Sequence, residues 1–272
     1  MQEIPQNIRK IAEDIENRYG LSNLIPITKP EPRITKKMLH QIVQNPSLIA
    51  QYIDHTALKP TTTMPDIKQL CLEAQSYQFC SVCIPSSFIV DAQVYFAEKQ
   101  NRFTPKICVV VGFPLGNTET QVKVAEIQRC IELGVDEIDF VVHIGWLLSK
   151  NYDAVLQEFK AIRNAAGNKI IKVILETCLL ELEDIAAACI LAKIAKIDFV
   201  KTSTGFGTDG ADIIDVSLMH RLFGDVGEVK ASGGIRTFDD ALLFLQLGST
   251  RLGCSRGVSI IKGQPLNNDY SY

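Results

Sequence analysis

The feature that most constrains the fold of this chain is a regular alternation of strand-like and helix-like stretches that begins near residue 51. Eight short runs are rich in apolar and β-branched residues and predict strands at Tyr52–Leu58, Phe79–Ile84, Lys106–Phe113, Glu137–Ile144, Ile170–Cys178, Phe199–Gly205, Gly227–Gly234 and Arg251–Cys254. Helical spacing of apolar residues lies between them, for example at Thr120–Leu133, Tyr152–Ala165, Leu182–Lys193, Ile213–Leu222 and Thr237–Leu247. Strands that alternate with helices are typical of a parallel sheet covered by helices.

Two architectures fit this alternation, a closed barrel and an open doubly wound sheet. Eight units over about 210 residues have the size of a (β/α)₈ barrel. The open sheet is disfavoured because no G-x-G-x-x-G sequence opens the first unit. The sequence therefore predicts an α/β protein with a (β/α)₈ TIM barrel at residues 51–262, and a flexible C-terminal tail at residues 263–272.

Residues 1–50 lie before the alternation and predict an N-terminal helical extension. Apolar residues recur there at helical spacing, at Ile4, Ile8, Ile11, Ile15 and Tyr19. Gly20 can end this first helix, and three prolines between residues 26 and 32 form a stiff connector. Thr35 can cap a second helix that runs to about Asn45. Nothing in this segment indicates catalysis.

The charge of the chain excludes several classes of partner. Lysine and arginine number 28 against 31 aspartate and glutamate, so the net charge is −3 and no basic field is available for nucleic acid. The N-terminus lacks the basic and apolar regions of a signal peptide, and no apolar run approaches the roughly 18–20 residues of a membrane span. We therefore expect a cytoplasmic protein that binds a small molecule, with neither nucleic acid nor membrane as a partner.

The eight cysteines predict buried thiols rather than a disulfide or a metal site. Cys80 and Cys83 form a C-x-x-C sequence, but they lie within one strand-like run, where positions i and i+3 point to opposite faces. No second C-x-x-C sequence is present to complete a zinc site.

One lysine lies where burial is expected. Lys201 follows Phe199 and Val200 in the sixth strand-like run. Burial disfavours an ammonium group, and a neutral lysine amine is a nucleophile toward carbonyl carbon. The alternative is a lysine whose ammonium group reaches solvent at the end of the strand.

Alternation within the other strands directs further ionisable residues to the same interior. In the fourth run the apolar positions suit the helix layer, so Asp139 should point into the barrel. The same reasoning directs Lys172 and Glu176 of the fifth run, and Glu228 and Lys230 of the seventh run, inward. A structural layer of ion pairs is one interpretation. Two neighbouring lysines, however, lower each other's pKa, which favours a reactive amine at Lys201.

Glycines follow the sixth, seventh and eighth strands and predict a phosphate site. Barrels frequently bind phosphate through loops at these strand ends, where backbone N–H groups can approach phosphate oxygens if no side chain intervenes. The candidates are Gly205, Gly233, Gly234, Gly253 and Ser255.

Five segments occur together in one order along the chain: Ile-Asp-His-Thr-Ala-Leu-Lys-Pro (53–60), Val-Gly-Phe-Pro-Leu-Gly (111–116), Glu-Ile-Asp-Phe-Val (137–141), Phe-Val-Lys-Thr-Ser-Thr-Gly-Phe (199–206) and Val-Lys-Ala-Ser-Gly-Gly-Ile-Arg-Thr (229–237). With these segments the chain resembles the deoxyribose-phosphate aldolase family over roughly residues 51–262. The joint match is specific, although no single segment would be.

The resemblance implies a metal-independent class I aldolase on a (β/α)₈ barrel. Such an enzyme reversibly cleaves 2-deoxy-D-ribose 5-phosphate to D-glyceraldehyde 3-phosphate and acetaldehyde, without a cofactor. By this resemblance Lys201 would form the Schiff base, Lys230 would tune it and Asp139 would carry the proton. The five candidates for the phosphate site named above would contact the phosphate of the substrate.

Several features depart from the family pattern or leave alternatives open. His143 stands where many members have asparagine, and Cys254 and Arg256 replace residues of the family's Gly-Thr-Ser-Ser-Gly sequence. Tyr272 could be a frayed end, or the terminal tyrosine of a tail that reaches the site. The substrate range, the physiological direction and the role of residues 1–50 stay open.

Three other interpretations compete with the aldolase. One is a different class I aldolase of the transaldolase kind, and a second is a barrel that binds phosphosugars without catalysis. A metal site near Asp54, His55 and His143 is the third, disfavoured because the chain has only four histidines and Schiff-base chemistry needs no Lewis acid. The oligomeric state is also open, since copies could associate into a homo-oligomer through the barrel helices or residues 1–50.

Overall fold

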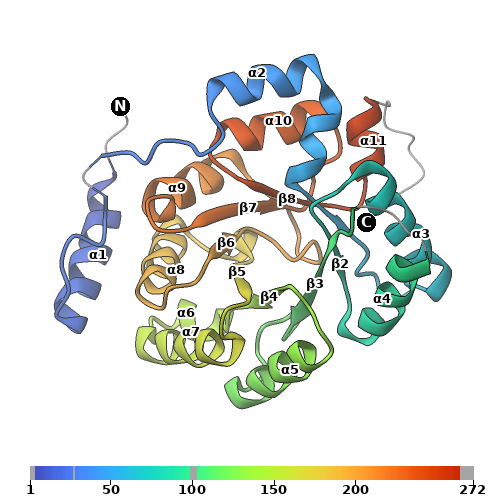
Figure 1. The fold of residues 1–272 in the computed structure, drawn as a ribbon. Helices are drawn as coiled ribbons and strands as arrows, with labels where there is room; N and C mark the ends of the chain where they lie inside the picture. The colour runs from blue at the N-terminus through green and yellow to red at the C-terminus, as the bar shows by residue number, and fades with distance from the viewer. Residues whose placement is uncertain (1–3, 27, 99–102, 264–272) are drawn as a thin grey trace.

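The computed structural model describes residues 4–26, 28–98 and 103–263 and has the predicted (β/α)₈ barrel at its centre (Figure 1). All neighbouring strands pair in parallel, and the last strand pairs with the first, which closes the barrel. The strands are β1 (Ile53–Thr56), β2 (Ser81–Ile84), β3 (Lys106–Val111), β4 (Glu137–Val141), β5 (Ile170–Ile174), β6 (Phe199–Lys201), β7 (Glu228–Ser232) and β8 (Arg251–Cys254).

All eight predicted strands are present, but several end earlier than the sequence pattern indicated. Strand β5 was expected to reach Cys178 and ends at Ile174. Two residues later Glu176 adopts a positive φ of 58°, and a 3₁₀ turn, η3 (Thr177–Leu179), follows. The apolar and β-branched residues beyond the strands are buried in loops at the mouth of the barrel, where propensity alone cannot distinguish them from strand.

Helices surround the barrel and bury their apolar faces against the outside of the strands (Figure 1). They are α3 (Met64–Tyr77), α4 (Ile89–Glu98), α5 (Thr120–Glu132), α6 (Ile144–Leu148), α7 (Tyr152–Ala166), α8 (Leu182–Ile194), α9 (Ile213–Phe223), α10 (Phe238–Gln246) and α11 (Gly257–Lys262), with 3₁₀ turns η1 (Pro46–Tyr52) and η2 (Ser86–Phe88). The Thr237 side chain caps α10 by accepting from the Asp240 N–H. No helix in the described part of the chain is long and apolar enough to cross a membrane.

The N-terminal extension forms two helices that pack on the outer surface of the barrel. Helix α1 (Gln6–Tyr19) lies against α8 and ends at Gly20, whose φ is 64°. Helix α2 (Lys36–Gln44) begins at the Thr35 cap and lies beside α10 (Figure 1). Both predicted helices are thus confirmed. They pack on barrel helices and contribute no residue to the loops that follow the strands.

One interior position was assigned wrongly from the sequence. Glu228 was expected to share the barrel interior with Lys230, but its carboxylate binds Arg33 of the extension at 3.0 Å and also accepts from Thr250. Glu228 is the first residue of β7, so its side chain lies at the N-terminal end of the strand and reaches Arg33 of the extension.

Candidate active site

The Asp139 carboxylate lies at the centre of the barrel and contacts three lysines. Its Oδ1 atom accepts from Lys172 Nζ at 2.8 Å, and its Oδ2 atom accepts from Lys201 Nζ at 2.9 Å and Lys230 Nζ at 2.7 Å. Asp139, Lys172 and Lys230 are fully buried, and Lys201 is 3% exposed. The structure therefore brings together the three residues that the sequence analysis proposed for catalysis.

Strand register explains this convergence. Asp139 of β4 is the partner of Lys172 on β5, and Lys201 of β6 is the partner of Lys230 on β7. Inward-pointing side chains of a barrel meet in layers, because successive residues of each strand alternate between the interior and the helix layer. Alternation within each strand was therefore sufficient to predict that Asp139, Lys201 and Lys230 point into the barrel.

A second group of ionised side chains lies beneath this layer, and the sequence analysis did not assign it to the site. Arg251 Nη1 of β8 contacts Asp54 Oδ1 at 2.7 Å and Glu137 Oε2 at 2.9 Å. Glu137 also contacts Lys172 at 2.6 Å, and Asp54 contacts Lys230. Glu137 shares its strand face with Asp139, so the same alternation could have identified it. Arg251 is the first residue of its strand, where the pattern gave no signal.

The charges of this network fix the protonation of most of its members. Burial alone would raise the pKa of Asp139, but Lys172, Lys201 and Lys230 lower it well below its usual range. Burial would likewise lower the pKa of Lys230, but Asp139 and Asp54 raise it above the ordinary value. Both effects follow from opposite charges held close together in a medium of low dielectric constant.

Two hydroxyl-rich loops surround the network at the ends of β6 and β7. Thr202 Oγ1 donates to the Ser232 carbonyl at 3.0 Å, and Ser232 Oγ donates to the Ser203 carbonyl at 2.6 Å. Glu176 accepts from the Thr204 amide at 3.2 Å and from the Thr204 hydroxyl. These bonds fix the conformation of the segment after Lys201. The sequence analysis did not identify Ser232 as part of the site.

The glycines of the predicted phosphate site lie at the same end of the barrel. Gly205, Gly233 and Gly234 have φ values of 86°, 81° and 75°, a region that residues with side chains rarely adopt. Gly253 differs, because it lies within β8, and an added Cβ would come within 3.1 Å of Lys230 Cε. The missing side chain at Gly253 therefore leaves room for Lys230, a packing role that the sequence did not reveal.

The histidines considered for a metal site have other partners. His55 is buried on the helix side of β1, where its Nε2 atom contacts Glu73 of α3 at 2.7 Å. His143 caps α6 through Nδ1, which accepts from the Trp146 amide at 3.3 Å, and its ring stacks on that indole. Tyr272 lies outside the described residues.

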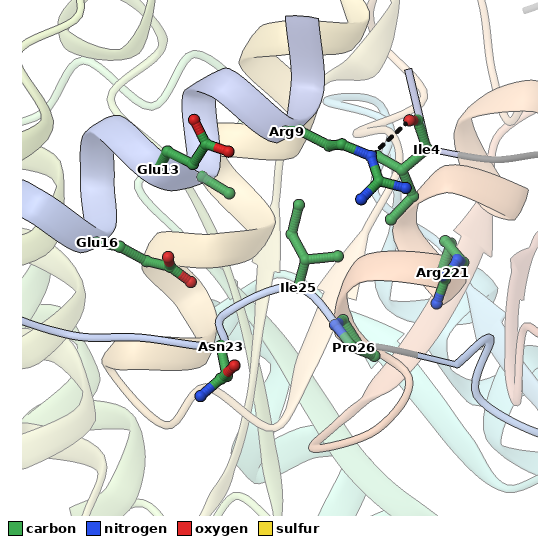
Figure 2. A pocket seen from close by; sticks show the side chains of 9 residues that line it. Ile4, Arg9, Glu13, Glu16, Asn23, Ile25, Pro26 and Arg221 are labelled. Carbon is green, nitrogen blue, oxygen red and sulfur yellow. Dashed lines mark hydrogen bonds between the residues drawn. The ribbon is translucent and has the colours of Figure 1, made fainter. Parts of the chain in front are cut away.

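A separate pocket of about 290 Å³ lies between the extension and the barrel helices (Figure 2). It is lined by α1, by the segment at 23–26 and by Arg221 of α9. None of the predicted site residues contributes to it. We therefore place the candidate active site in the barrel interior and at the mouth of the barrel.

The buried carboxylates predict a dependence of stability on pH. Lys172 and Arg251 hold the pKa of Glu137 at about 2 against the effect of burial, and the pKa of Asp54 is also lowered. A carboxyl whose folded-state pKa is depressed stabilises the fold above its unfolded pKa of about 4 and loses that contribution as pH falls through the folded value. Urea unfolding should therefore give a nearly constant midpoint from about pH 8 to 5 and a falling one from about pH 4 toward 2. An unchanged midpoint at about pH 3 would contradict this electrostatic account.

The chain is similar to known aldolases in both sequence and structure. A family model described as DeoC/LacD family aldolase matches residues 48–261. The chain is 48% identical over 226 residues to the deoxyribose-phosphate aldolase of Carboxydothermus hydrogenoformans, covering 82% of this chain and 97% of that protein. It is 46% identical over 220 residues to the deoxyribose-phosphate aldolase of Streptococcus sanguinis, covering 81% and 98%.

Two solved structures are similar to the whole fold. The tetrameric deoxyribose phosphate aldolase of Aeropyrum pernix matches with a TM-score of 0.74 and 32% identity, over 84% of this chain and 97% of that one. A protein from Coccidioides immitis matches with a TM-score of 0.78 and 36% identity, over 98% of this chain and 100% of that one. The second match spans nearly the whole chain and therefore includes most of the N-terminal extension.

Proposed function

This chain belongs to the DeoC/LacD aldolase family, and on that premise we propose that it reversibly cleaves 2-deoxy-D-ribose 5-phosphate to D-glyceraldehyde 3-phosphate and acetaldehyde through a Schiff base on Lys201. Residues 51–262 carry the reaction in this proposal. Copies of the chain associate into a homo-oligomer, by analogy with the tetrameric protein of Aeropyrum pernix.

The observation that carries the proposal is the unequal pairing of the buried lysines. Among the described residues, Lys201 makes one ion pair with a carboxylate, whereas Lys172 and Lys230 each make two. If every group were ionised, the network would hold five cations and three carboxylates, because Arg251 and the exposed Lys106 also contact its carboxylates. One lysine can therefore be neutral without leaving a carboxylate unpaired, and among the three buried lysines Lys201 is the one held by the fewest opposite charges.

The first half of the reaction forms the imine. The Lys201 amine adds to the C1 aldehyde carbon of the open-chain substrate, and the resulting carbinolamine loses its hydroxyl as water to give an iminium ion. The proton that leaves the nitrogen and the proton that leaves with water can pass through Asp139 Oδ2, which is within hydrogen-bond distance of both Lys201 and Lys230. Lys230 stays cationic beside it and tunes Lys201 through its charge.

The second half breaks the carbon–carbon bond. A base, most directly a water held by Asp139, removes the proton of the C3 hydroxyl, and the C2–C3 electron pair moves into the iminium to give an enamine on Lys201. The C3–C5 fragment leaves as D-glyceraldehyde 3-phosphate. Protonation of the enamine at C2 and hydrolysis of the new iminium release acetaldehyde and restore the Lys201 amine.

The loops after β6, β7 and β8 supply the proposed phosphate site. Gly205, Gly233 and Gly234 expose backbone next to the segment that begins at Lys201, and Ser255 follows β8. We assign these residues and Gly253 to the phosphate end of the substrate. With the phosphate there, the extended sugar directs its aldehyde into the barrel toward Lys201.

Trapping with borohydride tests the covalent step. Incubation with 2-deoxyribose 5-phosphate and sodium borohydride should reduce the iminium to a stable secondary amine, and peptide mass mapping should find that adduct on the peptide that contains Lys201. A transaldolase-like enzyme would prefer a different sugar phosphate as the trapping substrate. A barrel that only binds phosphosugars would give no adduct, and that result would falsify the proposed function.

Removal of divalent metals should leave the reaction intact. The proposed electron sink is the protonated imine, which replaces the Lewis acid that a metal would supply. Turnover of 2-deoxyribose 5-phosphate is therefore expected to be unchanged after dialysis against EDTA, as measured by a coupled assay for glyceraldehyde 3-phosphate. A loss of activity that added metal restores would reopen metal-assisted catalysis.

A further inference from the structure

Two cysteine thiols share the barrel interior with the proposed catalytic residues, and the mechanism above uses neither. Cys83 of β2 and Cys108 of β3 are register partners on adjacent parallel strands, and both are fully buried. Cys108 Sγ donates to Asp139 Oδ1 at 3.1 Å. One ligand atom from each of Cys83, Cys108 and Asp139 lies within 4.8 Å of the other two.

These three side chains offer the donors that thiophilic divalent cations prefer. Zn²⁺ binds thiolate sulfur at about 2.3 Å and carboxylate oxygen at about 2.0–2.2 Å in a tetrahedral arrangement. Ligand atoms around one such ion are therefore separated by about 3.6–3.8 Å. Since the three ligand atoms lie within 4.8 Å of one another, no separation exceeds the expected value by more than about 1 Å.

Three buried lysines surround this cluster and would repel a bound cation, but loss of the thiol protons offsets its charge. Each thiol loses its proton when it binds Zn²⁺, so one metal ion with two thiolates leaves the net charge of the interior unchanged.

The two oxygens of Asp139 divide the competing contacts. Oδ2 accepts from Lys201 and Lys230, whereas Oδ1 accepts from Cys108 and Lys172. A cation bound through Oδ1 replaces the hydrogen bond from Cys108 and leaves the two contacts at Oδ2 in place. It also displaces Lys172 Nζ, which lies 2.8 Å from Oδ1 and 3.4 Å from Cys108 Sγ and keeps Glu137 as its partner at 2.6 Å. A second set of close donors, Asp54, Cys108 and Glu137, is a poorer zinc site, because Arg251 already binds both of its carboxylates.

We propose that Cys83, Cys108 and Asp139 form a binding site for Zn²⁺ or another thiophilic divalent cation, and that occupation of this site inhibits the enzyme. Inhibition follows because a carboxylate that ligates a cation can no longer take up and return a proton. This inhibitory part rests on the function proposed for Asp139, whereas the binding part rests on the geometry alone.

Cadmium provides a spectroscopic test of binding. The full-length protein, reduced with a phosphine and freed of metal, should develop an ultraviolet thiolate-to-cadmium charge-transfer band that saturates at one equivalent of Cd²⁺ and is displaced by Zn²⁺. Cys108→Ala should lose this band. Cys71→Ala is the matched control, because Cys71 is an equally buried thiol on α3, outside the interior, and this variant should keep the band. Cys83→Ala should also lose it and replaces Cys108→Ala if that variant does not fold.

Enzyme assays in metal buffers test inhibition, with each variant referred to its own activity without metal. The native chain should lose activity as free Zn²⁺ rises and recover it in EDTA, while Mg²⁺ at the same concentration should not inhibit. In Cys108→Ala the zinc concentration for half-inhibition should rise by about tenfold or more.

Different results would contradict the metal site, its inhibitory role and the proposed function. Absence of the cadmium band, or an equal band in the native chain, Cys83→Ala and Cys108→Ala, overturns the metal site. A band without inhibition overturns the inhibitory role. Borohydride trapping, scored without metal, reports independently on the proposed function.

Discussion

Replacement of Lys201 by arginine is expected to reduce turnover of 2-deoxyribose 5-phosphate by about four orders of magnitude or more. Arginine keeps the positive charge next to Asp139, but its guanidinium group does not lose a proton in proteins and cannot form an imine. The loss therefore isolates the nucleophile from the ion pair that Lys201 makes at 2.9 Å. Steady-state kinetics and borohydride trapping measure the effect.

Lys230→Arg is the matched comparison for this variant. Lys230 is also buried and also contacts Asp139, but in the proposed mechanism it remains a cation. We expect this variant to be slower than the native chain and still to form the reduced adduct at Lys201. Full turnover by Lys201→Arg, or an adduct that maps to residue 230 of the native chain, would show that the nucleophile had been assigned wrongly.

Asp139→Asn is expected to damage both activity and stability. The substitution removes the carboxylate that three buried lysines contact, and loss of one partner of a buried ion pair costs about 3–5 kcal/mol of unfolding free energy. Turnover should fall by about 10²–10⁴-fold, the usual contribution of a positioned acid or base. Urea unfolding and steady-state kinetics on the same preparation give both quantities.

Asp153→Asn serves as the control for the stability effect. Asp153 is an exposed aspartate that contacts Arg18 at 3.6 Å and accepts from Tyr19. Surface pairs of this kind contribute about 0–1 kcal/mol, so its unfolding midpoint should stay close to that of the native chain. Equal stability losses in the two variants would argue against the buried network as a major stabilising element.

The inward orientation of the three residues proposed for catalysis could be predicted because it depends on local periodicity, whereas their proposed roles came from the family resemblance. Lys201, Lys230 and Asp139 each occupy the inward-pointing position of an apolar strand, and period-2 alternation assigns such positions without knowledge of the partner strands. Glu137 obeys the same rule and was within reach of the sequence. Gly253 could be identified as a glycine near a strand end, but the sequence alone does not show that it lies against Lys230.

Other parts of the site depend on which strands are neighbours. Arg251 joins Asp54 to Glu137 only because β8 closes the barrel against β1, and this contact spans 197 residues of sequence between Arg251 and Asp54. The Cys83–Cys108 pair likewise arises from the register of β2 and β3. No local pattern distinguishes these residues from other buried side chains.

The sequence by itself determined the eight-unit barrel, the two helices of the extension and the inward positions of the three residues proposed for catalysis, because propensity, capping and alternation act over a few residues. Tertiary structure alone decided how the interior charges pair. Ion pairing in a buried site depends on distances of about 3–4 Å between side chains from different strands. Those distances follow from strand register and barrel closure, and within the described part of the chain they leave Lys201 with one carboxylate partner where Lys172 and Lys230 have two.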